Sequence, residues 1–135
     1  MKAYPVQTAF LIDDSEVDLF VHKKFLEICQ FANQIVAFSS ATKALEELTT
    51  FSNGSKSIVF LDLNMPLVNG FEFLEKVRLS SSDLFDRMNV VILTSSLSID
   101  DRERALTFKN VISFIPKPLT IQGLDELARL VVSSE

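Results

Sequence analysis

FLIDDS, residues 10–15, is the stretch that decides the fold, because a run of apolar residues ends there in two adjacent carboxylates. The same pattern returns in IVFLD, residues 58–62, where a second apolar run ends at an aspartate. A third run, VVILT at residues 90–94, ends in a hydroxyl, and a fourth ends near Lys117. Parallel strands gather their carboxyl ends at one edge of a sheet, so these polar groups are predicted to share one crevice.

Length and composition limit the class of protein. A chain of 135 residues makes one ordinary domain, and 47% hydrophobic with 23% charged residues is typical of a soluble globular fold. We therefore expect one domain over residues 1–135, with no output domain. The single cysteine, Cys29, excludes an intrachain disulfide and fits a reducing compartment such as the cytoplasm.

Charge and hydropathy argue against two kinds of partner. The net charge is -5 and no basic run is longer than Lys23-Lys24, so no nucleic-acid surface is expected. The apolar run from Ala9 to Ile12 is too short for the core of a signal peptide. No stretch is long enough to predict a membrane span, so no membrane insertion is expected.

Five short apolar runs alternate with stretches of helical spacing. The runs lack the two-residue period of a half-exposed strand, which indicates strands covered on both faces: Ala9 to Ile12, Ile35 to Phe38, Ile58 to Leu61, Val90 to Leu93 and Val111 to Ile115. Apolar stripes predict helices through Val17, Val21, Phe25 and Ile28, through Ala41, Ala44, Leu45 and Leu48, through Phe73, Leu74 and Val77, and through Leu124, Leu127 and Val131. Together with the right-handed crossover rule, this alternation predicts an α/β, flavodoxin-like (βα)5 fold. Its doubly wound parallel five-stranded sheet has the order 2-1-3-4-5, with helices on both faces.

Three local interpretations complete the outline. Ser98 and the acids after it suit a helix N-terminus, so a further helix is predicted over Ile99 to Phe108. The stretch from Ser80 to Arg87 is interpreted as a polar connection. His22 stands beside Lys23-Lys24 and is interpreted as a solvated surface histidine.

Three carboxylates at one edge of a sheet need a compensating charge. Two of them about 4 Å apart repel by roughly 4 kcal/mol at an effective dielectric constant of about 20. Mg²⁺ supplies that charge, and it prefers one or two carboxylates together with waters and phosphate oxygens. Asp13, Asp14 and Asp62, with Thr94 and Lys117, therefore predict an open site for metal-assisted phosphoryl chemistry.

Each of these residues alone has a plainer explanation. Asp14 or Ser15 could cap the helix that follows, and Asp62 or Thr94 could simply end a strand. Lys117, between two prolines, could be a solvated turn residue. A common site is favoured because all of these residues stand at or near the ends of predicted strands.

Four motifs in this order make the chain resemble the receiver domain of two-component response regulators, essentially from end to end. They are LIDDS at residues 11–15, FLDLNMP at residues 60–66 with Asn69-Gly70, ILTS at residues 92–95 and FIPKP at residues 114–118. The resemblance implies a phosphorelay protein that depends on Mg²⁺. It also implies a chain that catalyses only its own phosphorylation and autodephosphorylation, and so is not an enzyme in the usual sense.

The resemblance assigns a role to each charged motif residue. Asp62 would be the nucleophile that accepts the phosphoryl group. Asp14 and Asp62 would bind Mg²⁺ directly, Asp13 would hold it through water, and the backbone carbonyl of Asn64 would add a ligand. Lys117 would pair with Asp62 at rest and with the phosphoryl oxygens afterwards.

The remaining motif residues concern switching and backbone shape. Thr94 matches the switch hydroxyl and Phe114 the aromatic switch position, although a phenylalanine at a strand end is also ordinary core. Lys117-Pro118 resembles the family's cis peptide bond. Asn69-Gly70 is interpreted as a turn in which glycine supplies a positive φ angle. Pro116 is tolerable if its strand lies at an edge of the sheet.

The partners implied by the resemblance are proteins. A histidine kinase or histidine phosphotransfer protein would donate the phosphoryl group from its own histidine, which is not His22. The first helix, around Phe20, would serve its docking. The face from Ile99 to Val132 would change on phosphorylation and bind an unknown downstream target or a second copy of the chain.

Other classes of function stay open. An aspartate-nucleophile phosphohydrolase shares the chemistry, but it needs a second carboxylate two residues after the nucleophile, where this chain has Asn64. A flavin or nucleotide binder needs a phosphate loop after the first strand, where Asp13-Asp14 would repel phosphate. A receiver-fold scaffold that works without phosphorylation also fits the sequence.

Overall fold

The computed structural model describes residues 4–48 and 57–133, except for the side chains of residues 132 and 133. Within these ranges five parallel strands form one sheet in the order β2-β1-β3-β4-β5, which confirms the predicted topology. The strands are β1 (Val6–Ile12), β2 (Ala32–Phe38), β3 (Ser57–Leu61), β4 (Val90–Thr94) and β5 (Val111–Pro116). Each contains one of the predicted apolar runs. β5 is an edge strand, where a proline such as Pro116 is tolerated.

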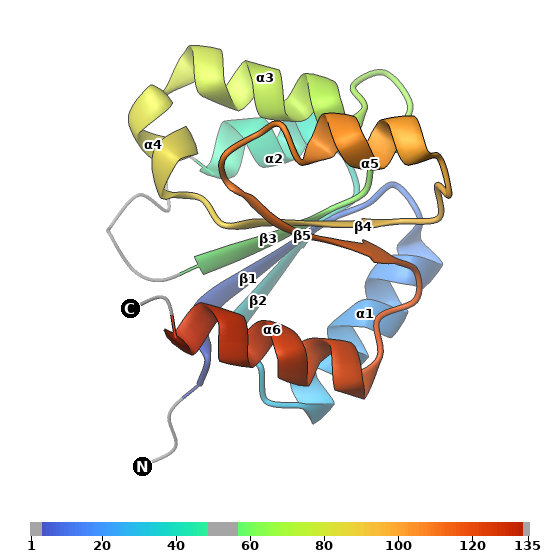
Figure 1. Cartoon of the computed structure of the whole chain (residues 1–135), viewed down its shortest axis with the longest axis vertical. Coiled ribbons are helices and arrows are strands. Elements are labelled where there is room, and N and C mark those ends of the chain that lie inside the picture. Colours follow the sequence, from blue (N-terminus) through green and yellow to red (C-terminus); the bar gives the residue numbers. More distant parts are fainter. Residues whose placement is uncertain (1–3, 49–56, 134–135) are drawn as a thin grey trace.

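Helices cover both faces of the sheet (Figure 1). They are α1 (Glu16–Ile28), α2 (Ala41–Leu48), α3 (Gly70–Ser80), α4 (Ser82–Arg87), α5 (Ile99–Ala105) and α6 (Ile121–Ser133). α2, α3, α4 and α5 lie on one face, and α1 and α6 lie on the other. No helix of the described ranges is long and apolar enough to cross a membrane.

Alternate side chains of the strands enter two separate cores. On β1, Phe10 and Ile12 belong to the core under α2 to α5, whereas Ala9 and Leu11 belong to the core under α1 and α6. All four are at most 3% exposed. Burial of one large apolar side chain stabilises a fold by about 1.5–3 kcal/mol, so both faces hold the sheet in place.

The buried face of α1 is not the predicted one. Leu19, His22 and Leu26 face the core, whereas Val17 and Ile28 of the predicted stripe are each 72% exposed. The prediction was wrong because the polar residue His22 interrupts the stripe that is buried. The apolar residues of the predicted stripe, such as Val17 and Ile28, form a second one that is largely exposed. His22 is only 2% exposed, so its interpretation as a surface histidine was wrong too. Burial lowers the pKa of His22, which favours the neutral imidazole.

The predicted polar connection from Ser80 to Arg87 contains the short helix α4. Ser81 caps it, because its Oγ accepts the backbone N–H of Leu84 at 3.1 Å. Phe85 anchors it in the first core at 7% exposure. A helix of 6 residues has too few turns to show a periodic stripe, which explains why the pattern did not indicate it.

The helix predicted over Ile99 to Phe108 begins where expected and ends earlier. Ser98 is its N-cap, accepting the backbone N–H of Asp101 at 3.2 Å. α5 ends at Ala105, whose side chain is fully buried. The helix therefore presents a narrow apolar face to the sheet and a charged face to solvent.

Candidate functional site

The carboxyl ends of β1 and β3 place two aspartates side by side. Ile12 pairs in register with Leu61, and the backbone N–H of the next residue, Asp62, donates to the carbonyl of Ile12 at 3.0 Å. On the other side of β1, the N–H of Asp13 donates to the carbonyl of Phe38 at 3.1 Å. The two aspartates are only 5% and 4% exposed, so the sheet itself holds both carboxylates in a low-dielectric position.

Asp14 completes a cluster of three carboxylates. Asp13, Asp14 and Asp62 each offer an oxygen, and these atoms all lie within 4.8 Å of one another. Asp14 is exposed whereas the other two are buried, so the cluster opens toward solvent. An open set of hard oxygen donors fits a hard divalent cation such as Mg²⁺, which keeps several waters.

Ser15 begins α1 and also orients the cluster. Its Oγ accepts the backbone N–H of Asp18 at 3.2 Å, so Ser15 is the N-cap that the plainer explanation proposed. Its own N–H donates to Oδ1 of Asp13 at 2.9 Å. The cap and the carboxylate site therefore occupy the same turn.

Lys117 reaches the cluster from the loop after β5. Its Nζ lies 2.7 Å from Oδ2 of Asp13, 2.7 Å from Oδ2 of Asp18 and 3.4 Å from Oδ2 of Asp62. Its side chain is 13% exposed, so the explanation as a solvated turn residue is wrong. The Lys117-Pro118 peptide bond is cis, as the resemblance implied.

The surroundings change the acidity of two of these groups. Burial raises the pKa of Asp62 and the charge of Asp13 raises it further, while Lys117 and the N–H of Asn64 partly oppose this rise. That N–H donates to Oδ1 of Asp62 at 3.3 Å. Burial by itself would lower the pKa of Lys117, but Asp13 and Asp18 more than reverse this and raise it above its ordinary value. The lysine is therefore charged throughout the neutral range.

The two residues predicted to switch lie on neighbouring strands. Thr94 ends β4 without exposed surface, and its Oγ1 accepts the backbone N–H of Ser96 at 3.2 Å. Its carbonyl accepts the backbone N–H of Lys117 at 2.9 Å, which joins it to the site. Phe114 is half-buried on β5, with the guanidinium of Arg102 5.9 Å from its ring centroid. Switching by Thr94 and Phe114 stays a prediction.

Gly70 approaches the backbone at the site too closely for any larger residue. A Cβ on Gly70 would lie 2.7 Å from the carbonyl oxygen of Asp62 and 2.9 Å from Cα of Leu63. The predicted reason for this glycine, a positive φ angle, was wrong, because Gly70 is the first residue of α3. Asn69 is the N-cap of that helix and forms a capping box with Glu72.

Gly70→Ala is expected to lower the free energy of unfolding by about 2 kcal/mol, because a clash with backbone forces a shift of the strand end. Gly123→Ala is the matched control, since the new Cβ would meet only Oγ1 of Thr120, at 3.1 Å. At both positions alanine also has a better helix propensity than glycine, by up to about 1 kcal/mol. Urea unfolding of both variants checks this, and equal stabilities would contradict the role of the close approach.

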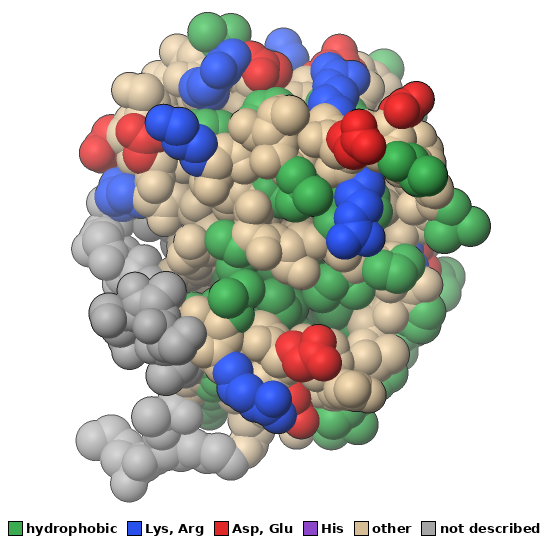
Figure 2. All heavy atoms as spheres, viewed as in Figure 1, with side chains coloured by type: hydrophobic (Ala, Val, Ile, Leu, Met, Phe, Trp, Pro, Cys, Tyr) green, Lys and Arg blue, Asp and Glu red, His purple; other side chains and the backbone are tan. Residues whose placement is uncertain are grey.

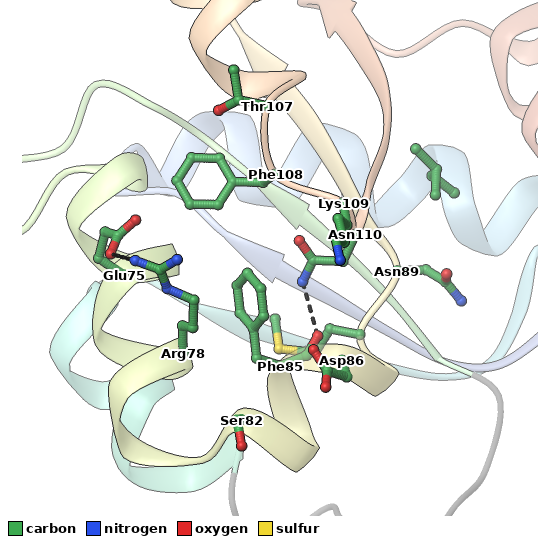
Figure 3. Close-up of a pocket in the computed structure, with 12 residues that line it drawn as sticks. Glu75, Arg78, Ser82, Phe85, Asp86, Asn89, Thr107, Phe108, Lys109 and Asn110 are labelled. Atoms are coloured by element: carbon green, nitrogen blue, oxygen red, sulfur yellow. Dashed lines mark hydrogen bonds and ion pairs between the residues drawn. The ribbon is translucent and has the colours of Figure 1, made fainter.

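A cavity of about 730 Å³ lies at the opposite end of the sheet (Figure 3). It is bounded by the end of α3, by α4 and by the segments that lead into β4 and β5. Asn110, on its wall, donates from Nδ2 to the carbonyl of Phe85 at 2.9 Å, and Arg78 pairs with Glu75 nearby. Asp62 and Lys117 do not line this cavity, so the carboxylate site is a separate one, at the carboxyl ends of the strands.

Asp18 is a member of the site that was not predicted from the sequence. It lies on the first turn of α1, three residues after the N-cap Ser15. The available signal was its place in the first turn of the helix that follows Asp13-Asp14, because a helix that starts after a strand's carboxyl end begins beside the same crevice. The burial of His22, one turn further along α1, was not predicted either, and the pKa of His22 responds to the charge of Asp18.

Comparisons with known proteins agree with this arrangement. The fold defines the class: the chain superposes on a two component response regulator from Cytophaga hutchinsonii with a TM-score of 0.86 and 26% identity, covering 95% of this chain and 98% of that one. A response regulator receiver protein from Dyadobacter fermentans gives 0.81 and 30%, covering 93% and 98%. Residues 9–129 match the response regulator receiver domain, and the chain belongs to that family.

Relatives of known sequence carry the same domain in different contexts. The chain is 31% identical over 117 residues to the probable methanogenesis regulatory protein FilR2 of Methanothrix harundinacea, covering 84% of this chain and 74% of that protein. It is 29% identical over 129 residues to the two-component response regulator ARR15 of Arabidopsis thaliana, covering 90% of this chain. The chain spans only 60% of ARR15, so the family identifies a signalling domain rather than a whole protein's activity.

Proposed function

We propose that this receiver domain accepts a phosphoryl group on Asp62 from the phosphohistidine of a histidine kinase or histidine phosphotransfer protein. One observation carries the proposal: Asp62 lies beside Asp13 and Asp14 at the open edge of the sheet, with the ammonium of Lys117 against them. A nucleophilic carboxylate, a cation-binding cluster and a fixed positive charge are the groups that phosphoryl transfer needs.

In the reaction, an oxygen of Asp62 forms a bond to phosphorus while the P–N bond of the donor breaks. The electron pair leaves with the imidazole nitrogen, which takes up a proton. Asn64 and Lys117 hold the carboxylate in place, since the N–H of Asn64 donates to Oδ1 and the ammonium approaches Oδ2. Water then hydrolyses the acyl phosphate, so the chain catalyses only its own phosphorylation and autodephosphorylation.

Asp13, Asp14 and Asp62 would hold Mg²⁺, with the backbone carbonyl of Asn64 as a further ligand. When bound, the cation would neutralise charge on the phosphoryl group and on the carboxylates together. Lys117 would then move its hydrogen bonds toward the phosphoryl oxygens, where charge-assisted bonds are strongest. The hydroxyl of Thr94 would be drawn the same way, and Phe114 would follow it.

The output surface is proposed on α5, β5 and α6, within the range from Ile99 to Val132. Figure 2 shows hydrophobic side chains gathered over the edge strand β5, between α5 and α6. Leu106, the C-cap of α5, and Ile121, the first residue of α6, are 50% and 55% exposed. A downstream protein or a second copy of the chain would bind this surface after phosphorylation.

The test is the intact mass of the protein after incubation with a small phosphodonor, with and without Mg²⁺. We expect one phosphoryl addition per chain, dependent on Mg²⁺ and removed by hydroxylamine, which cleaves acyl phosphates. No addition in either condition, together with no Mg²⁺ binding by calorimetry, would support a scaffold that uses the fold without phosphorylation. Turnover of an external phosphoester would instead support a phosphohydrolase, although Asn64 stands where its second carboxylate is needed.

A further inference from the structure

Asp18 is a partner of Lys117 that does not belong to the cluster of three carboxylates. The Nζ of Lys117 lies 2.7 Å from Oδ2 of Asp18 but 3.4 Å from Oδ2 of Asp62. The contact joins the first turn of α1 to the loop after β5, across 99 residues of sequence. The lysine side chain is 13% exposed and that of Asp18 is 37% exposed, so this ion pair is partly shielded from water.

The backbone fixes both ends of this ion pair. The N–H of Asp18 donates to the Oγ of Ser15, the N-cap of α1, at 3.2 Å. The N–H of Lys117 donates to the carbonyl of Thr94 at 2.9 Å. Exposed ion pairs contribute little when two flexible side chains must be ordered to form them. Here Asp18 has a short side chain and the side chain of Lys117 is only 13% exposed, so less freedom is lost and the pair can set where the ammonium lies.

An ammonium has three N–H donors, and Lys117 has three carboxylate partners in the structure. Two of them, Asp13 and Asp62, also belong to the cluster that fits a divalent cation. A cation there repels the ammonium and competes for the same oxygens. Asp18 lies outside the cluster, so a cation bound there leaves the contact between Asp18 and the lysine in place.

We propose that Asp18 is a positioning residue: it holds the ammonium of Lys117 beside Asp62 while Asp13 and Asp62 are occupied in phosphoryl transfer. This inference rests on the proposed function and adds a residue to it. Without Asp18, a lysine facing an occupied cluster would turn toward solvent, and the phosphoryl group would lose a fixed positive charge. Asp18 itself touches neither the donor nor the phosphoryl group in this scheme.

The experiment compares the unmodified protein with Asp18→Asn, Asp18→Glu and the control Glu16→Gln. Glu16 is exposed on the same turn of α1, so its replacement removes an equal charge from the same region. Phosphorylation by a small phosphodonor is followed by intact mass at saturating Mg²⁺. We expect Asp18→Asn to be about tenfold slower, the effect of one charge-assisted hydrogen bond. Asp18→Glu should recover most of the rate, and Glu16→Gln should keep all of it.

A second readout separates positioning from a merely structural role. The amines are labelled with a trace of acetic anhydride, with and without Mg²⁺, and the labelled lysines are mapped by mass spectrometry. Labelling of Lys117 should rise severalfold in Asp18→Asn, most strongly with Mg²⁺, while labelling of Lys76 and Lys109 stays unchanged. Equal phosphorylation rates and equal Lys117 labelling in Asp18→Asn and Glu16→Gln would overturn the positioning role of Asp18 but would leave the proposed function intact. No phosphorylation of the unmodified protein would overturn the proposed function, and this inference with it.

Discussion

Asp62→Asn is expected to abolish phosphoryl uptake completely while making the protein more stable. The amide has no negatively charged oxygen that can attack phosphorus, so no phosphoryl adduct should appear in the intact mass at any Mg²⁺ concentration. Asn is close in shape to Asp and can still accept from the N–H of Asn64, so the local fold should persist. The same variant should also bind Mg²⁺ more weakly, since a carboxylate of the cluster is gone.

The gain in stability follows from the raised pKa of Asp62. Burial and Asp13 make the ionised carboxylate unfavourable in the folded protein. Removing that charge should raise the free energy of unfolding at neutral pH, without Mg²⁺. Because the folded pKa lies above the unfolded one, the gain should fade as the pH falls through both values, where Asp62 is neutral anyway. Urea unfolding at several pH values measures this.

Two results would contradict this account of Asp62. A phosphoryl adduct that persists in Asp62→Asn would place the acceptor elsewhere. A variant that is less stable than the unmodified protein at neutral pH would mean that the ion pair with Lys117 outweighs burial and repulsion at this carboxylate. Asp83→Asn serves as the control for charge removal, because Asp83 is 84% exposed and pairs with Arg87 on the surface of α4.

The meeting of Asp13 and Asp62 was predictable because topology alone brings it about. Both residues follow apolar runs that are buried on both faces, and such runs are parallel strands in an alternating α/β chain. The order of the sheet then places β1 beside β3, and their carboxyl ends must adjoin. No side-chain packing is needed to reach this conclusion.

The partners of Lys117 could not be predicted in the same way. Which side of α1 faces the site depends on the rotation of the helix about its axis, and tertiary packing sets that rotation. α1 is apolar on more than one side, with Phe20 64% exposed and Leu26 fully buried, so its pattern did not decide between two faces. His22 was therefore misplaced and Asp18 was not predicted, since both positions depend on the same rotation.

Gly70 shows a different limit of the sequence. A glycine after Asn69 suits a turn with a positive φ angle as well as it suits a close contact. Only the structure shows the carbonyl of Asp62 where a Cβ would be. The glycine thus serves the carboxylate site through packing, by letting α3 begin directly against the strand end.

Lys117→Met is expected to destabilise the protein by about 3 kcal/mol at neutral pH in the absence of divalent cations, because it leaves Asp13 and Asp62 buried without a cation. Methionine keeps all but the last atom of the side chain's length, so the loss reports mainly on charge rather than on packing. Lys24→Met is the control: its side chain is 57% exposed, and its pair with Glu27 at 3.6 Å should contribute less than about 0.5 kcal/mol.

The dependence on pH and on Mg²⁺ identifies the origin of that loss. Without Lys117, the pKa of Asp62 should rise further above its unfolded value, so the folded state binds an extra proton and regains stability as the pH falls. Mg²⁺ should replace the missing charge and stabilise the folded protein by about 2.7 kcal/mol at a hundred times its Kd. The variant should also bind Mg²⁺ more tightly than the unmodified protein, because Lys117 no longer competes for Asp13 and Asp62. A loss that neither acid nor Mg²⁺ reverses would instead assign Lys117 a packing role in the loop after β5.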